Sequence, residues 1–418
     1  MAADRPGSSA TSSTGERDAT ADHESVILTG TRVRARPTPL DVPAVEWGAE
    51  SPRSPLEELV VITGSVRSLS LHGAGRRAPT AKLRALLDRV DETEEADVYG
   101  VGGAVTRLEE RVAELLGKEA AVLMPTGSMA SQVALRLHAD ARTTRRVAFH
   151  PRAHIEVHER KGYAVVHGLT GHQLGDADRL VALDDLHEVR EPLAAVLLEL
   201  PQRDLGGLLP EWDDLVAQTS WARERGIATH LDGARLWEAQ PYYARPHAEI
   251  AALFDTVYVS LYKGLEGLAG ALLAGPADQI AQAREWRARL GGQLHNAWPI
   301  ALDAERGLDT LLPRIPAFWE RAKELAAAIG SVPGVEVVPD PPQTPLFHVL
   351  VHAPKAGLER AHAQLVEARG VELFRYARTT TSPRWSRFEL TVGENAMAVD
   401  VDEVRDVMSE LVRAATEA

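Results

Sequence analysis

Apolar residues recur along residues 105–116 at the spacing of one helix face. Positions 105, 108, 112, 115 and 116 are apolar, and Gly117 follows directly. A stripe with this period is typical of an amphipathic helix, and glycine commonly ends a helix. The pattern therefore predicts a helix over residues 105–116, then a short apolar run at 120–124 and a second helix over 129–137.

Further short apolar runs are bounded by polar or glycine-containing segments. They lie at residues 194–200, 227–231 and 256–261. Short strands separated by helical stretches are typical of a mostly parallel sheet covered by helices on both faces. We therefore expect residues 55–311 to form a large α/β domain.

The pattern changes beyond residue 312, where longer helical segments alternate with strand-like ones. We expect helices at 318–329, 358–368 and 401–415, and strands at 335–338, 347–351 and 388–392. This mixture predicts a smaller α+β domain over residues 312–418. Residues 1–50 are rich in Ser, Thr, Ala, Pro and charge without sustained periodicity, which predicts a disordered or loosely attached arm.

Composition narrows the class of protein. A net charge of −14 over 418 residues argues against nucleic acid or an anionic membrane as a partner. The chain has no cysteine, which excludes disulfides, thiol nucleophiles and cysteine metal ligands. No stretch approaches the ~18 continuous apolar residues that span a bilayer, and no basic-then-apolar export pattern is seen. We expect a cytoplasmic protein.

Lys263 is the first candidate for a catalytic residue. It follows the apolar run at 256–261 and precedes a glycine-rich turn with Gly264, Gly267 and Gly270. A lysine at the end of a buried strand is partly desolvated, which lowers the pKa of the ammonium and favours imine chemistry. The alternative is a strand-end lysine that reaches solvent.

Asp232 and Arg235 end another apolar run, in the segment Thr229-His230-Leu231-Asp232-Gly233-Ala234-Arg235. Pyridoxal phosphate (PLP) needs an acidic partner for its ring nitrogen, and a nearby cation suits its phenolic oxygen or the substrate carboxylate. The alternative is an N-cap aspartate with a structural ion pair. Gly127 and Ser128, in the turn before the helix at 129–137, form a candidate phosphate site. Together the three segments favour PLP.

The sequence resembles the low-specificity threonine aldolase and β-eliminating-lyase family over roughly residues 68–387. The most specific matching stretch is His230-Leu231-Asp232-Gly233-Ala234-Arg235-Leu236. Further matches are Asp97-Val98-Tyr99-Gly100, Thr126-Gly127-Ser128-Met129-Ala130 and Lys263-Gly264-Leu265. The resemblance implies a PLP-dependent, transferase-like fold of type I, as in aspartate aminotransferase.

The resemblance also implies a role for each matching residue. Lys263 would form the Schiff base, Asp232 would hold the ring nitrogen, and Gly127 and Ser128 would hold the phosphate. His154 would stack on the ring, while Arg235, Ser68 and Arg387 would bind the substrate carboxylate. The implied reaction cleaves a threonine-like β-hydroxy-α-amino acid at Cα–Cβ to glycine and an aldehyde. The implied assembly is a homodimer or homotetramer with a shared active site.

The sequence departs from the family pattern at positions near the substrate. The family's Glu-Asn-Thr-His stretch, whose histidine meets the β-hydroxyl, reads Glu199-Leu200-Pro201-Gln202 here. Gln202 can hydrogen-bond a hydroxyl but cannot act as a base near neutral pH, which leaves His154 acting through water. Three further departures lie elsewhere. Tyr262 stands where the family has a serine before the lysine, and the family's Gly-Glu-Asp-Pro reads Gly100-Val101-Gly102-Gly103 here. The family also has an arginine near the phosphate, which is missing from the segment Gly291-Gly292-Gln293-Leu294-His295-Asn296.

Three other functions remain open at this stage. PLP-dependent β-elimination or racemisation on the same scaffold fits the missing histidine. His150, His154 and His158 would share a face if they lay on one helix, which suggests a metal-dependent hydrolase, although Pro151 interrupts that helix. A non-catalytic protein with the same fold is the third.

Overall fold

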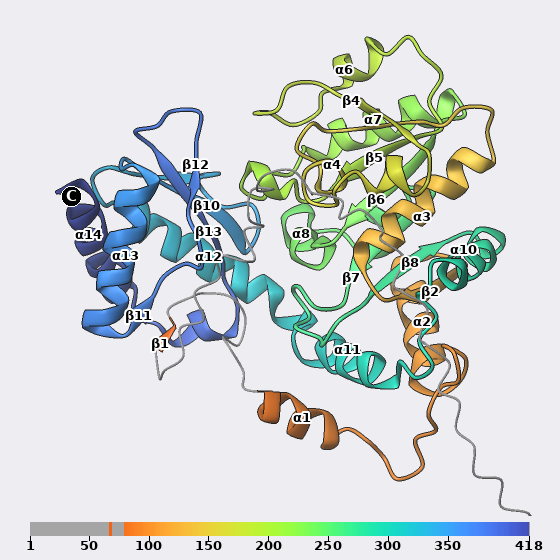
Figure 1. The fold of residues 1–418 in the computed structure, drawn as a ribbon, viewed down its shortest axis with the longest axis horizontal. Coiled ribbons are helices and arrows are strands. Elements are labelled where there is room, and N and C mark those ends of the chain that lie inside the picture. The colour runs from red at the N-terminus through yellow and green to blue at the C-terminus, as the bar shows by residue number, and fades with distance from the viewer. Residues whose placement is uncertain (1–66, 69–78, 418) are drawn as a thin grey trace, which may run out of the picture. The chain divides into compact units, whose positions relative to one another are not determined.

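The computed structural model describes residues 67–68 and 79–417 (Figure 1). The arm predicted for residues 1–50 lies outside the described residues. A sheet of seven strands has the order β2-β8-β7-β6-β5-β3-β4, in which only β8 runs antiparallel to its neighbours. The strands are β2 (Ala120–Met124), β3 (Arg146–Phe149), β4 (Thr170–Gln173), β5 (Ala195–Glu199), β6 (Ala228–Gly233), β7 (Thr256–Ser260) and β8 (Ala271–Gly275).

The predicted α/β class and mostly parallel sheet are confirmed. Apolar runs at 120–124, 194–200, 227–231 and 256–261 became β2, β5, β6 and β7. Strands β3, β4 and β8 were not predicted. β4 reads Thr-Gly-His-Gln, so this edge strand carries no apolar run that would reveal it.

Both faces of this sheet are covered by helices. Along β7, Val257 and Val259 pack in the core with α2 (Gly103–Leu116), α8 (Leu236–Tyr243) and α11 (Trp298–Thr310). Tyr258, between them, packs on the other side with α3 (Gly127–Asp140) and α10 (Ala277–Arg289). The alternation follows from the two-residue period of a strand. The other helices here are α1 (Pro79–Leu87), α4 (His154–Val157), α5 (Gly162–Val165), α6 (Leu183–His187), α7 (Trp212–Glu224) and α9 (His247–Ala251).

The two helices predicted first are confirmed with small changes in their ends. α2 ends at Leu116, and Gly117 takes a left-handed conformation with φ of 60°, as a glycine after a helix often does. α3 begins at Gly127, two residues before the predicted start, because the Thr126 hydroxyl accepts a hydrogen bond from the Met129 backbone N–H.

The C-terminal part holds a second, antiparallel sheet of order β12-β13-β10-β9. Its predicted helices and strands are confirmed, and the domain boundary at residue 312 stays a prediction. The elements are α12 (Ile315–Gly330), β9 (Val335–Val338), β10 (Leu346–Val351), α13 (Lys355–Arg369), β11 (Val371–Glu372), β12 (Arg378–Thr379), β13 (Ser386–Thr391) and α14 (Val401–Thr416). Strand β1 (Arg67–Ser68) pairs in parallel with β11.

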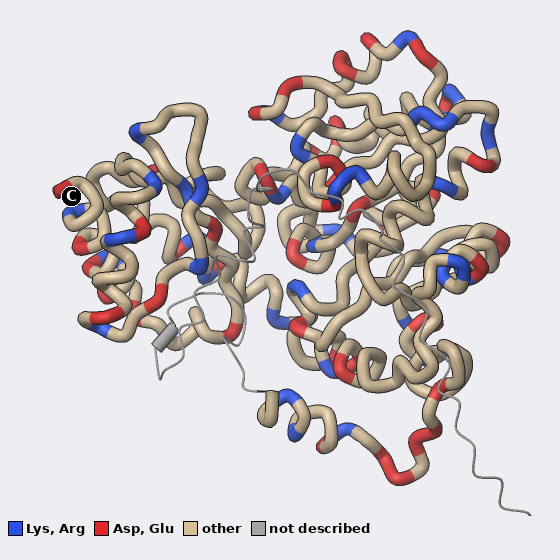
Figure 2. The backbone as a smooth tube through the Cα atoms, viewed as in Figure 1, with Lys and Arg blue, Asp and Glu red and all other residues tan. Residues whose placement is uncertain are grey.

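Acidic and basic residues are interspersed along most of the described chain, and residues 91–97 form one short acidic stretch (Figure 2). The excess of negative charge is therefore distributed over many segments. Within residues 79–417, no helix is both long and apolar enough to cross a bilayer.

Candidate active site

Three functional side chains gather where neighbouring parallel strands end. Glu199 ends β5 and lies in register with Asp232 near the end of β6, and Lys263 follows β7, which pairs with β6. The carboxyl ends of adjacent parallel strands meet at one edge of a sheet, where α/β proteins commonly bind ligands. The fold thus brings the predicted Lys263 and Asp232 together.

Lys263 and Asp232 both lack a charged partner within the described part of the chain. Asp232 is 2% exposed, and its carboxylate accepts one hydrogen bond, from the Ala234 N–H at 3.1 Å. Burial raises the pKa of Asp232, and burial together with the charge of Arg235 lowers the pKa of Lys263. A buried carboxylate and a largely buried amine that form no ion pair suit the protonated ring nitrogen and the aldehyde carbon of PLP.

His154 is held from two sides at the start of α4. Its backbone N–H donates to Glu199 at 3.0 Å, and its Nδ1 lies 2.9 Å from Glu159 Oε1. Burial lowers the pKa of His154, but the Glu159 hydrogen bond and the charges of Asp232 and Glu159 outweigh burial and raise it overall. The imidazole is therefore fixed in orientation next to Asp232, as a residue that packs on a cofactor ring should be.

Glu199 is a largely buried carboxyl group to which the sequence alone assigned no role. It accepts hydrogen bonds from the backbone N–H groups of His154 and Arg203, both at 3.0 Å, and from Gln202 Nε2 at 3.3 Å. Burial and the neighbouring charge of Asp232 raise the pKa of Glu199 from 4.5 to about 7. Two adjacent buried carboxyl groups resist losing both protons.

We expect Glu199 to make the cofactor-free protein less stable as pH rises from about 4.5 to about 7. Over this range the folded state keeps a proton that the unfolded state releases, so stability is highest below 4.5. Relative to Glu199→Gln, the wild-type free energy of unfolding should fall by on the order of 3 kcal/mol. Urea unfolding at pH 4.5 and 8 measures this. The exposed Glu224→Gln variant is the control, and an equal pH slope in all three proteins would contradict the assignment.

The predicted phosphate turn lies at the N-terminus of α3. Gly127 and Ser128 are its first two residues, and Thr126 caps the helix. Free N–H groups at a helix start bind phosphate well. A Cβ atom on Gly127 would lie 1.9 Å from the Tyr258 hydroxyl oxygen, so only glycine fits against this side chain of β7.

Gly127→Ala is therefore expected to weaken PLP binding and to destabilise the fold by about 1–3 kcal/mol, the usual cost of overpacking. Fluorescence titration should show a larger loss for PLP than for pyridoxal, which lacks the phosphate. Gly330→Ala is a matched control, because the nearest atom to its new Cβ would be 3.5 Å away. Equal losses for both ligands would place the defect elsewhere than at the phosphate turn.

Arg235 forms a buried ion pair. A structural ion pair was the alternative, from the sequence, to a contact with PLP or the substrate carboxylate. Its NH1 donates to both carboxylate oxygens of Glu238, at 2.8 and 2.7 Å, while its Nε has no partner within the described residues. The side chain is 7% exposed, and its charge acts on Lys263. Arg235 thus lies at the site, but part of its charge is already neutralised by Glu238.

The other residues predicted to bind substrate are Gln202, Arg387 and Ser68. Gln202 is 3% exposed and directs its amide to the Arg152 carbonyl, at 3.2 Å, and to Glu199. Arg387, on β13, donates to the Asp204 carbonyl at 3.0 Å. Ser68 lies on β1 opposite Glu372, and its side chain is outside the description. Their contacts with substrate stay predictions.

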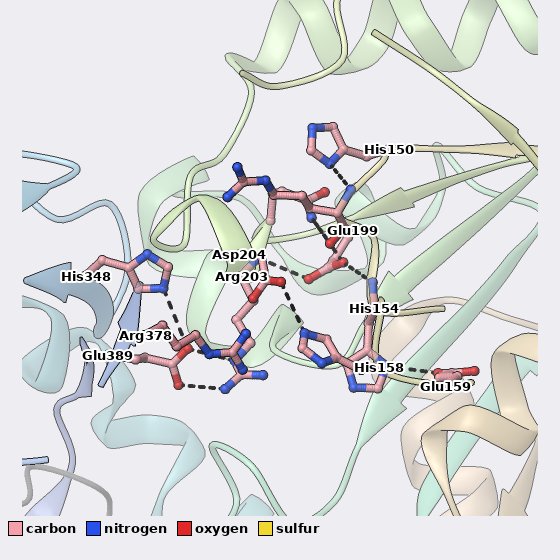
Figure 3. A network of polar contacts seen from close by, with 12 residues as sticks. His150, His154, His158, Glu159, Glu199, Arg203, Asp204, His348, Arg378 and Glu389 are labelled. Atoms are coloured by element: carbon pink, nitrogen blue, oxygen red, sulfur yellow. Dashed lines mark hydrogen bonds and ion pairs between the residues drawn. The ribbon is translucent and has the colours of Figure 1, made fainter. Parts of the chain in front are cut away.

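A polar network missed by the sequence analysis joins the two sheets (Figure 3). Arg203, just after β5, donates to both oxygens of Glu389 on β13, at 2.7 and 3.1 Å. The next residue, Asp204, accepts from His158 at 3.1 Å. Arg203 and Asp204 directly follow the Glu199–Gln202 segment that the analysis had singled out, which is the one local signal that could have found them.

The three histidines proposed as metal ligands do not share a helix face. α4 begins only at His154, and His150 Nε2 lies 2.8 Å from the Arg179 carbonyl oxygen. Within residues 79–417, no group of three or more histidine and carboxylate side chains is arranged to hold a metal ion. The geometry gives the metal-dependent alternative no support.

Comparisons with known proteins identify the family of this chain. A family model for beta-eliminating lyases matches residues 78–353. Low-specificity L-threonine aldolase 1 of Arabidopsis thaliana is 28% identical over 284 residues, 65% of this chain and 78% of that protein. The low specificity L-threonine aldolase of Escherichia coli K12 is 34% identical over 240 residues, 55% and 70% of the two chains.

A solved structure shows a similar fold. It comes from Listeria monocytogenes, where the protein is provisionally described as an L-allo-threonine aldolase. That structure matches with a TM-score of 0.78 at 38% identity, covering 82% of this chain and 95% of that one. The predicted fold of type I is confirmed. The chain belongs to the beta-eliminating lyase family, whose members are PLP-dependent lyases.

Proposed function

We propose that this protein cleaves the Cα–Cβ bond of a β-hydroxy-α-amino acid, with PLP as cofactor, to give glycine and an aldehyde. The observation that carries the proposal is the pair of oppositely charged, unpartnered side chains, Lys263 and Asp232, at neighbouring strand ends. Its relatives among the threonine aldolases supply the reaction class.

The residues present fit the cofactor at each of its functional groups. Lys263 would hold the aldehyde carbon, Asp232 the protonated ring nitrogen, and Gly127 with Ser128 the phosphate. His154 would lie against the ring, held there by Glu159. Bound PLP would supply a ring that takes up the electron pair left at Cα when the Cα–Cβ bond breaks.

The substrate carboxylate has a candidate site on the second sheet. Arg378 and Arg387 lie opposite each other on β12 and β13, and neither has a carboxylate partner within the described residues. Both line a small pocket, together with Asp204, His348 and Glu389. Burial and the charges of Arg152 and Arg378 lower the pKa of Arg387, and together they outweigh the opposing charges of Asp204 and Glu389. A carboxylate bound here would fix the substrate by two groups, its amine and its carboxylate.

We also propose a homodimer or homotetramer acting in the cytoplasm. Leu83 and Leu87 of α1, and Val98, Tyr99 and Val101 beside α2, are between 49% and 71% exposed. Apolar residues exposed in such groups commonly mark a subunit interface. Sedimentation of the purified protein at several concentrations tests the assembly, and a monomer at micromolar concentration would overturn this part of the proposal.

The test of the reaction uses purified protein with PLP. An absorbance band near ~420 nm would report the cofactor bound to the enzyme. L-threonine, L-allo-threonine and phenylserine are then added in turn, and glycine and aldehyde are measured. Equal amounts of both products from any of the three would support the proposal. Release of ammonia and an oxo acid without aldehyde would instead indicate elimination, and no cofactor band would contradict the assignment of the site.

A further inference from the structure

His158 belongs to a histidine–carboxylate pair beside the proposed active site. It lies one helical turn after His154, and the two imidazole rings are 5.1 Å apart between centroids. Its Nε2 is 3.1 Å from Asp204 Oδ2 (Figure 3). The side chain is 24% exposed, so it is neither sealed in the core nor free in solvent.

The partner of His158 fixes which ring nitrogen carries the proton. Burial raises the pKa of Asp204, but the hydrogen bond and charge of His158, with the charges of Arg378 and Arg203, lower it to about 2. Asp204 is therefore an acceptor at neutral pH, and Nε2 of His158 is the donor. Nδ1 of His158 is hydrogen-bonded by no residue in the described ranges, so in the neutral form of the ring this nitrogen carries the free lone pair.

The His158–Asp204 pair lies between the two ends of the proposed substrate site. On one side, His154 is within electrostatic reach of Lys263 and Asp232. On the other, the backbone carbonyl of Asp204 accepts from Arg387, the proposed carboxylate ligand. An amino acid whose amine takes the place of Lys263 and whose carboxylate binds Arg387 would lie between these two groups, in the region that His158 and Asp204 border.

The other candidates for the base are already engaged. The Gln202 amide is directed to Glu199 and to the Arg152 carbonyl, and an amide does not accept a proton near neutral pH. His154 shares its Nδ1 with Glu159, which favours the protonated ring. Of Gln202, His154 and His158, only His158 has a free ring nitrogen that can accept the proton of the β-hydroxyl.

We infer that His158, oriented by Asp204, removes the β-hydroxyl proton of the substrate. The inference rests on the proposed function. As the proton moves to Nδ1, the electron pair of the O–H bond forms the carbonyl of the departing aldehyde. The pair of the Cα–Cβ bond stays with Cα, which later takes up a proton to give glycine. His158 is then a catalytic residue, and Asp204 is a positioning residue.

The experiment compares two reactions of the PLP-loaded enzyme. Aldehyde release needs a base at the β-hydroxyl, whereas exchange of a glycine α-hydrogen with deuterium from D₂O does not. His158→Gln should lower kcat for aldehyde release by roughly 10²–10⁴-fold, the usual contribution of a positioned base. Glycine exchange should change little. Asp204→Asn should lower aldehyde release by a smaller factor, because the base remains but its tautomer is no longer fixed.

Controls separate a catalytic role from a structural one. His187→Gln removes an exposed histidine, 3.8 Å from Asp184, and should leave both reactions unchanged. In the cofactor-free protein, ¹⁵N spectra should show His158 protonated at Nε2 in the wild type, and this preference should be lost in Asp204→Asn. Equal losses of both reactions in His158→Gln, or no loss of either, would overturn the assignment. If the wild type exchanges glycine but releases no aldehyde from any substrate, the proposed function fails first and the role of His158 fails with it.

Discussion

Lys263→Ala is expected to abolish covalent attachment of PLP and to reduce turnover by at least ~10²–10⁴-fold, the range for loss of a positioned proton-transfer group. The Lys263 amine is largely but not fully buried, its pKa is lowered by burial and by Arg235, and it has no hydrogen bond or ion pair within the described residues. Such an amine is available to form and release an imine. Borohydride reduction followed by peptide mapping would measure the attachment.

The fold should survive this substitution, because the Lys263 side chain forms no hydrogen bond or ion pair within the described residues. Lys355→Ala is the control, since it removes a partly exposed amine that pairs with Glu359 one helical turn away. That variant should keep both cofactor and activity. A borohydride-stable PLP adduct persisting in Lys263→Ala would show that another amine carries the cofactor.

Asp232→Asn is expected to have opposite effects on the loaded and the cofactor-free protein. In the loaded enzyme it removes one partner of a buried ion pair, which costs about 3–5 kcal/mol. PLP binding should weaken by about 10²-fold or more. In the cofactor-free protein it removes a buried carboxylate that forms no ion pair and whose pKa is raised by burial despite the charges of His154 and Lys263, so the free energy of unfolding should rise by about 1 kcal/mol or more.

The sign of the pH dependence gives a second check on Asp232. Burial raises the pKa of this carboxyl group, so the stability it contributes is present at low pH and is lost as pH rises. The advantage of Asp232→Asn in the cofactor-free protein should therefore grow with rising pH. Asp278→Asn removes an exposed carboxylate in the first turn of α10 and controls for net charge alone. A fall in stability of the cofactor-free variant at pH 8 would contradict this account.

The strands that carry the site were predictable because their signal is local. β5 and β7 are mainly apolar and β6 is buried along its whole length although it contains Thr229 and His230, and the polar residue at the end of each of the three runs stands out. Lys263 and Asp232 could therefore be assigned from the sequence before the strands were known to be neighbours.

The rest of the site depends on contacts between distant segments. Arg203 and Glu389 are 186 residues apart in sequence, and no local pattern announces their pairing. His158 was considered only as a metal ligand on a continuous helix. The fold instead ends α4 at Val157 and turns the imidazole of His158 to Asp204 on another loop. Such roles follow from tertiary packing, which periodicity does not encode.

The Arg203–Glu389 pair also has a consequence for how the protein unfolds. It links the segment after β5, in the seven-stranded sheet, to β13 in the antiparallel sheet. If either sheet melted alone, the other would be left with an unpaired charge in a largely buried position, at a cost of about 3–5 kcal/mol. Calorimetry should therefore record one cooperative transition in which both sheets are lost together.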